Sequence, residues 1–342
     1  MDLEKHVGLA LQGGGAHGAF TWGVLDRLLE EELLIADSIC GTSAGAVNAV
    51  VVAYGLHVGG TAKAKELLEL LWKKISVSGG MLFKPGIWDK MLGGGDIYNS
   101  PGYVWFNAMS QFLSPYNFNP LNYNPLRDIL TDLVDFNELH LYSKKKLFIC
   151  ATNVKTNRAK IFTNKDITVD AVLASACLPF LYQAVEIDGD FYWDGGYMGN
   201  PPIFPLITNS TVKDIVLVKI NSINIPSVPK SARDISDRVN EISFNSSLIN
   251  EMKIIHYRNE LIRNGILKSD EHVNREIFIH TISGYDALSR LNYSSKMNTS
   301  WDFLVDLKNK GRATAQRWIE TEFELVGRKS TFDVEEHFFG KF

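Results

Sequence analysis

Cysteine is scarce in this chain, and long apolar segments are absent. The three cysteines among 342 residues, Cys40, Cys150 and Cys177, stand apart in apolar stretches without the spacing of zinc ligands or of a disulfide framework. The N-terminus lacks the apolar segment of a secretory signal peptide, and the longest apolar run, which follows residue 43, is too short to cross a bilayer. We therefore expect a cytoplasmic protein with reduced cysteines and without a metal site or a transmembrane segment.

An excess of charge is also missing. The 35 basic and 39 acidic residues give a net charge of -4, and no long basic run occurs, so nucleic acid is not an expected partner. With 45% hydrophobic residues the chain has enough apolar material for a large core. These proportions indicate a globular protein and leave its oligomeric state open.

The chain does contain a nucleophile-elbow pattern. Residues 41–45 read GTSAG, a G-x-S-x-G match that follows a short apolar run and precedes a small-residue helix. A serine on such a turn stands clear of the sheet, and Gly41 and Gly45 remove side chains that would collide there. The positive end of the following helix would point at Ser43. Taken alone, the match is equally compatible with a glycine-punctuated turn before a buried helix.

A glycine loop lies just upstream. Residues 12–18 read QGGGAHG, between an apolar strand at 7–11 and a helix from about residue 19. Gly13, Gly15 and Gly18 also satisfy G-x-G-x-x-G, the pattern of dinucleotide-binding loops. That alternative needs a further strand ending in an acidic residue about twenty positions on, and here that region turns into the serine elbow. We therefore favour a loop whose backbone N–H groups donate to an oxyanion.

A tight turn at the end of a predicted hairpin carries Asp194. Strand and helix patterns alternate over the first part of the chain, as a parallel sheet with covering helices requires. Farther on, a hairpin is expected at 185–196, and its second strand leads into a turn that carries Asp194 between an aromatic residue and two glycines. An Asp-Gly pair by itself is typical of a simple turn.

Two segments interrupt or extend this alternation. Residues 79–125 are rich in Gly, Pro, Asn and aromatic side chains, which predicts an insertion that either packs on itself or forms a lid or lipid-facing rim. Helical patterns at 232–262 and from residue 301 predict a C-terminal helical extension over 221–342, with a further strand near 276–282. Residues 1–220 would form the catalytic core.

Four motifs in order resemble those of the patatin-like phospholipases. They are GGGAHG after the first strand, GTSAG after the second, ASACLPF before the hairpin and DGG at its end. The resemblance covers about the first 220 residues. It implies an α/β fold, a three-layer sandwich with a mainly parallel central sheet, and a lipid acyl hydrolase that works without a metal ion or cofactor.

The resemblance also assigns roles to residues. It implies a serine–aspartate dyad, with Ser43 as nucleophile and Asp194 as its partner, and oxyanion-hole N–H groups from Gly13, Gly14 and Gly15. A carboxylate can take the serine proton directly if burial raises its pKa toward the working pH. The expected partner is a lipid ester at a membrane or micelle surface, which would make the protein peripheral to the membrane.

Alternatives to the dyad hydrolase stay open. A Ser-His-Asp triad would need a histidine after the acid in chain order, and the candidates are His256, His272, His280 and His337. His17, where the family often has Arg or Lys, lies in the glycine loop and could reach the ester. Transfer of the acyl group to an acceptor other than water would use the same acyl-enzyme. A non-catalytic lipid-binding protein on the same fold is the remaining alternative.

Overall fold

The sheet is the centre of the molecule. The computed structural model describes residues 4–32, 34–79, 96–98, 100–110, 112–142, 144–225, 227–269 and 274–339. The strands are β1 (Lys5–Leu11), β2 (Leu34–Thr42), β3 (Lys146–Asn153), β4 (Arg158–Thr163), β5 (Val185–Ile187), β6 (Asp190–Asp194), β7 (Asp214–Lys219) and β8 (Phe278–Ser283). They form one sheet in the order β5-β6-β3-β2-β1-β7-β8, with β4 also paired to β3.

The sheet is mainly parallel, as predicted. Strands β3, β2, β1, β7 and β8 pair in parallel, whereas β4, β5 and β6 join through antiparallel pairs. The central strands have apolar residues on both faces, which is what a sheet covered on both sides requires. In β1, Leu9 and Leu11 pack into one apolar cluster, and Ala10 packs into the other.

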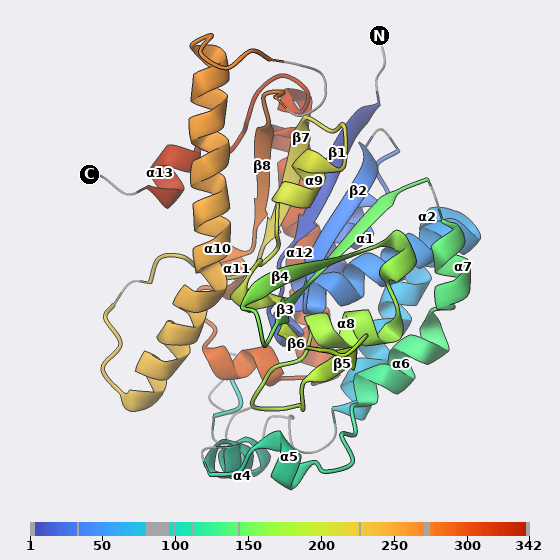
Figure 1. Cartoon of the computed structure of the whole chain (residues 1–342), viewed down its shortest axis with the longest axis vertical. Coiled ribbons are helices and arrows are strands. Elements are labelled where there is room, and N and C mark those ends of the chain that lie inside the picture. Colours follow the sequence, from blue (N-terminus) through green and yellow to red (C-terminus); the bar gives the residue numbers. More distant parts are fainter. Residues whose placement is uncertain are drawn as a thin grey trace.

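Helices cover both faces and complete the three layers (Figure 1). One layer contains α1 (Gly18–Leu28), α2 (Ala44–Ser78), α6 (Pro125–Leu133), α8 (Val169–Ser175) and α12 (Trp301–Thr321). The opposite layer contains α9 (Phe204–Thr208), α10 (Ala232–Arg263) and α13 (Val334–Phe338). Shorter elements are η1 (Gly15–His17), α4 (Pro101–Ser110), α5 (Pro115–Phe118), α7 (Phe136–Leu141), η2 (Asn164–Asp166), η3 (Gly195–Tyr197), α11 (Tyr285–Leu288), η4 (Tyr293–Met297) and η5 (Phe323–Leu325). All three cysteines are buried and form no disulfide.

The α2 helix consists of two segments. It is broken at Gly59 and Gly60, where Gly60 has a φ of 70°. The first segment is the small-residue helix predicted after residue 43, and the second is the amphipathic helix that the sequence predicts at about residues 61–75. By length and composition, α2 is the one helix of the described ranges that could cross a membrane. Its most apolar window is 56% buried within the protein, which a core helix also shows.

The C-terminal part of the chain packs directly on the core. Strand β8 extends the sheet beside β7, where the sequence predicts a strand near 276–282. Helix α12 crosses α1 closely, because a Cβ on Gly311 would lie 2.1 Å from the Phe20 carbonyl oxygen and one on Gly23 would lie 1.9 Å from that of Lys308. Only glycine allows two helix backbones to approach this far.

The predicted insertion over 79–125 is described in part. Residues 80–95, 99 and 111 lie outside the described residues. The remainder forms α4 and α5, at the end of the molecule toward which the carboxyl ends of β1 and β2 point (Figure 1). In open α/β sheets this end is where ligands bind.

Candidate active site

Ser43 sits on a sharp turn between β2 and α2. Its φ of 54° and ψ of -124° are strained for a residue with a side chain, and such strain occurs at functional sites. The flanking glycines make the turn possible. A Cβ on Gly41 would lie 2.5 Å from the Gly45 carbonyl oxygen, and a Cβ on Gly45 would lie 2.1 Å from that of Leu11. The backbone therefore has the form of a nucleophile elbow.

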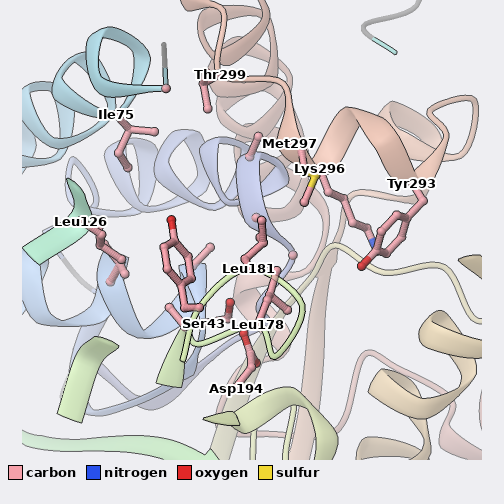
Figure 2. A pocket seen from close by; sticks show the side chains of 18 of the residues that line it. Ser43, Ile75, Leu126, Leu178, Leu181, Asp194, Tyr293, Lys296, Met297 and Thr299 are labelled. Carbon is pink, nitrogen blue, oxygen red and sulfur yellow. The ribbon is translucent and has the colours of Figure 1, made fainter. Parts of the chain in front are cut away.

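Strand register brings Asp194 to Ser43. On β3, Cys150 pairs with Thr42 at the end of β2, and the next residue, Ala151, pairs with Asp194 at the end of β6. Because β4 occupies the other edge of β3, β2 and β6 meet end to end along the same edge. Both residues line one cavity, and their side chains lie next to each other in Figure 2.

The Asp194 carboxyl is fully buried and incompletely hydrogen-bonded. Oδ1 accepts a hydrogen bond from the Gly196 N–H at 2.8 Å, whereas Oδ2 has no partner of ordinary hydrogen-bond geometry in the described structure. Burial raises the pKa of Asp194 to about 7, against the smaller opposing effects of the Gly196 N–H and the Ser43 hydroxyl. A carboxylate with this pKa and one open oxygen can accept the proton of Ser43.

The glycine loop corrects one expected role. The Gly13 N–H already donates to Asn200 Oδ1 at 2.7 Å, so it is not free to bind an oxyanion, and Gly13 does not line the cavity. Gly14 and Gly15 do line it, and no hydrogen-bond acceptor for either N–H occurs in the described part of the chain. Ala44 also lines the cavity, and as the first residue of α2 its N–H has no acceptor within the helix.

Several residues support the glycine loop and the elbow, and the sequence did not reveal these tasks. Asn221 donates from Nδ2 to the Gly13 carbonyl oxygen at 2.7 Å, and Gln12 Oε1 accepts from the Asn221 N–H at 2.9 Å. These bonds, with the bond from Gly13 to Asn200, fix the start of the glycine loop. Ser175 Oγ accepts from the Ser43 N–H at 3.0 Å. Ser175 belongs to ASACLPF, so that motif marked the residue without revealing its task.

The cavity has a volume of about 440 Å³ and two chemically different sides. Its apolar side comes from α2, α6 and the segment after α8, with Trp72, Ile75, Leu126, Ile129, Leu178 and Leu181 among the lining residues. Its polar side includes Asn221, Asn240, Glu241, Tyr293 and Lys296. In Figure 2, Ile75 and Leu126 lie on one side of the dyad, and Lys296 and Tyr293 lie on the other.

The histidine alternatives do not converge on Ser43. His280 is buried, with Nε2 2.9 Å from Asp214 Oδ1, while His256 and His337 pack against phenylalanine rings elsewhere. His272 lies outside the described residues. None of the described histidines lines the cavity.

His17 is held inside the protein. Its Nε2 lies 2.7 Å from Ser295 Oγ, and burial, with a smaller effect of the Lys296 charge, lowers its pKa to about 3. The imidazole is therefore neutral at physiological pH, and the glycine loop carries no charge at this position. Among the residues that the structure describes, no cluster of three or more His, Cys, Asp or Glu side chains could hold a metal ion.

A family model and two curated proteins match this chain in sequence. A family model described as patatin-like phospholipase matches residues 9–207. Lysophospholipase NTE1 from two strains of Cryptococcus neoformans var. neoformans serotype D is 28% identical over 236 residues, which cover 69% of this chain. The chain spans about 12% of the length of these curated relatives.

Solved structures show weaker similarity. VipD from Legionella pneumophila aligns with a TM-score of 0.43 at 16% identity, covering 93% of this chain and 67% of VipD. A chain of the ExoU–SpcU complex from Pseudomonas aeruginosa aligns with a TM-score of 0.33 at 19% identity, covering 71% of this chain and 51% of its own length. Since the family model spans more than half of the 342 residues and includes both the serine elbow and Asp194, the chain belongs to the patatin-like phospholipase family.

Proposed function

We propose that this protein is a serine hydrolase that cleaves fatty-acyl esters of phospholipids or lysophospholipids through a Ser43–Asp194 dyad. The observation that carries the proposal is the buried Asp194 carboxyl, whose unpartnered oxygen lies beside the Ser43 elbow on a largely apolar cavity. Membership of the family supports a lipid hydrolase in general. The cavity side formed by α2 and α6 suits an acyl chain, because burying apolar surface favours binding.

The chemistry follows from the two side chains. Asp194 accepts the hydroxyl proton while Ser43 Oγ bonds to the ester carbonyl carbon. The ester C–O bond then breaks, and the departing alcohol takes the proton from Asp194, leaving an acyl-enzyme. Water attacks the acyl carbon and gives one proton to Asp194. Release of the fatty acid returns that proton to Ser43.

Backbone donors would stabilise the negative charge that develops on the carbonyl oxygen. The N–H groups of Gly14 and Gly15 are available for this, and Ala44 offers a third donor at the start of α2. Each well-placed donor of this kind stabilises the transition state by roughly 3 kcal/mol. The three groups belong to rigid backbone next to Ser43, so little reorganisation accompanies the reaction.

The described part of the insertion supports delivery of substrate from a lipid surface. Phe112 is 84% exposed and Leu121 is 91% exposed, close in sequence to α6, whose Leu126 lines the cavity. A group of exposed apolar side chains suits contact with an apolar partner. We therefore propose that this exposed apolar rim, which includes Phe112 and Leu121, contacts the membrane or micelle that holds the substrate.

Ester hydrolysis by matched variants tests the proposal. Wild type, Ser43→Ala and Asp194→Asn are compared on a medium-chain p-nitrophenyl ester and on phospholipid and lysophospholipid vesicles, all in chelator. Ser246→Ala on the exposed side of α10 and Asp190→Asn on β6 serve as controls, because neither residue lines the cavity. We expect wild type and controls to release fatty acid, and both dyad variants to lose nearly all activity.

Two results would contradict the proposal. Retained hydrolysis by Ser43→Ala would exclude Ser43 as the nucleophile, and an inactive wild type would favour a lipid-binding protein. Product analysis with added lysolipid or alcohol separates hydrolysis from acyl transfer, because transfer would yield a new ester in place of free fatty acid.

A further inference from the structure

A basic side chain, Lys296, lines the active-site cavity. Lys296 belongs to η4, which is outside residues 9–207 that match the family model. It is the one lysine or arginine among the described residues that line the cavity. Because His17 is neutral, the glycine loop brings no charge of its own, and Lys296 is the basic side chain of this site.

Packing fixes Lys296 beside the catalytic loop. Its backbone carbonyl oxygen would lie 2.3 Å from a Cβ on Gly15, so η4 is in close contact with the loop that carries the oxyanion donors. Its Nζ donates to Asn221 Oδ1 at 2.9 Å, and Asn221 in turn donates to the Gly13 carbonyl oxygen. The ammonium is therefore connected through one side chain to the backbone next to Ser43.

The hydrogen-bonding capacity of this ammonium is largely unused. An ammonium has three donors, and within the described chain the single acceptor that Nζ reaches is the neutral Asn221 amide, with no carboxylate within salt-bridge distance. The Tyr293 ring lies 5.1 Å from Nζ. Burial is the largest effect on Lys296 and lowers its pKa, and the opposing effects of the more distant Glu241 and Asp237 are smaller. An anion in the cavity would offset the cost of that burial.

The arrangement also orients a substrate. Ile75 and Leu126 lie on one side of Ser43, and Lys296 lies on the other (Figure 2). An ester bound with its acyl chain on the apolar side directs its alcohol portion toward Lys296. In a glycerophospholipid that portion carries a phosphodiester, which is anionic and accepts hydrogen bonds from an ammonium.

We propose that Lys296 binds the phosphate of the lipid headgroup and so makes the cavity selective for phospholipids or lysophospholipids over neutral esters. This inference rests on the proposed function, since it names the substrate class of the same site. It assigns to the C-terminal part of the chain a direct role in substrate recognition. Lys296 acts as a specificity residue that contacts the headgroup, while the dyad performs the chemistry.

Binding of two lipids that contain no carboxylic ester tests the headgroup site without turnover. Dodecylphosphocholine and 1-O-dodecylglycerol share the alkyl chain, and the first has a phosphocholine headgroup where the second has an uncharged glycerol. Their dissociation constants are measured by titration calorimetry below the micelle concentration, for wild type, Lys296→Met and the exposed-lysine control Lys253→Met. We expect Lys296→Met to weaken dodecylphosphocholine binding by about tenfold or more, as the loss of a charge-assisted hydrogen bond does. Dodecylglycerol binding should stay within about twofold.

Several results would overturn the headgroup site. Equal weakening of both ligands would mean that Lys296 only supports packing, and unchanged binding of both would mean that it takes no part. If Lys296→Met fails to fold, Lys296→Gln is measured in its place. The wild type alone also tests the site, because equal affinity of wild type for the two ligands would refute it. Displacement of dodecylphosphocholine by inorganic phosphate at similar concentration would indicate a free-anion site instead.

The outcomes separate this inference from the proposed function. A protein that discriminates the two ligands through Lys296 but hydrolyses no ester would overturn the proposed function alone. A protein that hydrolyses lipid esters through Ser43 but binds both ligands alike would overturn the headgroup site alone.

Discussion

Replacing Asp194 with Asn should stabilise the protein while removing its activity. The carboxyl is fully buried, and burial raises its pKa from an ordinary 3.8 to about 7. A carboxyl whose folded-state pKa exceeds its unfolded value weakens the folded state as pH rises between those two values. Asparagine has nearly the same shape and can keep the hydrogen bond from the Gly196 N–H, but it cannot ionise.

The size of the effect follows from the same shift. A rise in pKa from 3.8 to about 7 corresponds to roughly 4 kcal/mol of folding free energy. Wild type is less stable by this amount above pH 7 than below pH 4, where the carboxyl is protonated in both the folded and the unfolded state. At a typical unfolding entropy of about 2 cal/mol/K per residue, this is about 6 °C in Tm for a chain of 342 residues. The variant should therefore melt about 6 °C above wild type at alkaline pH, and the difference should shrink as the pH falls toward 5.

Thermal unfolding of both proteins from pH 5 to pH 8.5 measures this directly. Asp190→Asn, on the same strand but outside the cavity, serves as the control and should show no comparable gain. A difference in Tm between Asp194→Asn and wild type that stays constant with pH would refute the reasoning, because the effect must follow ionisation of the carboxyl. A variant less stable than wild type at pH 8 would refute it as well.

Three further predictions concern the pH dependence of catalysis, the glycine loop and the exposed apolar rim. Because Asp194 must be ionised to accept a proton, kcat/KM on a soluble ester should rise through an apparent pKa near 7 and level off above it, as a pH–rate profile would record. Asn200→Ala leaves the Gly13 N–H without its acceptor and should destabilise the protein by about 1–3 kcal/mol in denaturant unfolding. Joint replacement of Phe112 and Leu121 by Ser should lower hydrolysis of vesicles severalfold and leave hydrolysis of a dissolved p-nitrophenyl ester unchanged.

Local patterns were sufficient to predict the sheet and the turns that carry Ser43 and Asp194. The elbow around Ser43 needs glycines where neighbouring backbone segments would clash with a side chain, so GTSAG alone indicates the turn. Apolar runs and glycine punctuation likewise predict the strands and both segments of α2, since these signals act over a few residues. The proximity of Ser43 and Asp194 depends on strand register, which no local pattern contains. From the sequence, the two residues were paired only through the resemblance of four ordered motifs to a known family.

Contacts between distant parts of the chain could not be predicted in this way. Gly13 was assigned to the oxyanion hole wrongly, because its N–H is taken by Asn200, 187 residues away. Lys296 was missed because no motif surrounds it, and it reaches the cavity only through the packing of η4 on the glycine loop. The raised pKa of Asp194 is likewise a property of burial, which no short pattern contains.

Covalent labelling of Ser43 tests the central claim most directly. Wild type, Ser43→Ala and Asp194→Asn are treated with an alkyl fluorophosphonate, and the adduct is located by peptide mass spectrometry. Because the reagent needs a serine activated by a base, we predict one adduct on Ser43 in wild type, none in Ser43→Ala and much slower labelling of Asp194→Asn. An adduct on another residue, or labelling of Asp194→Asn at the wild-type rate, would contradict a Ser43–Asp194 dyad.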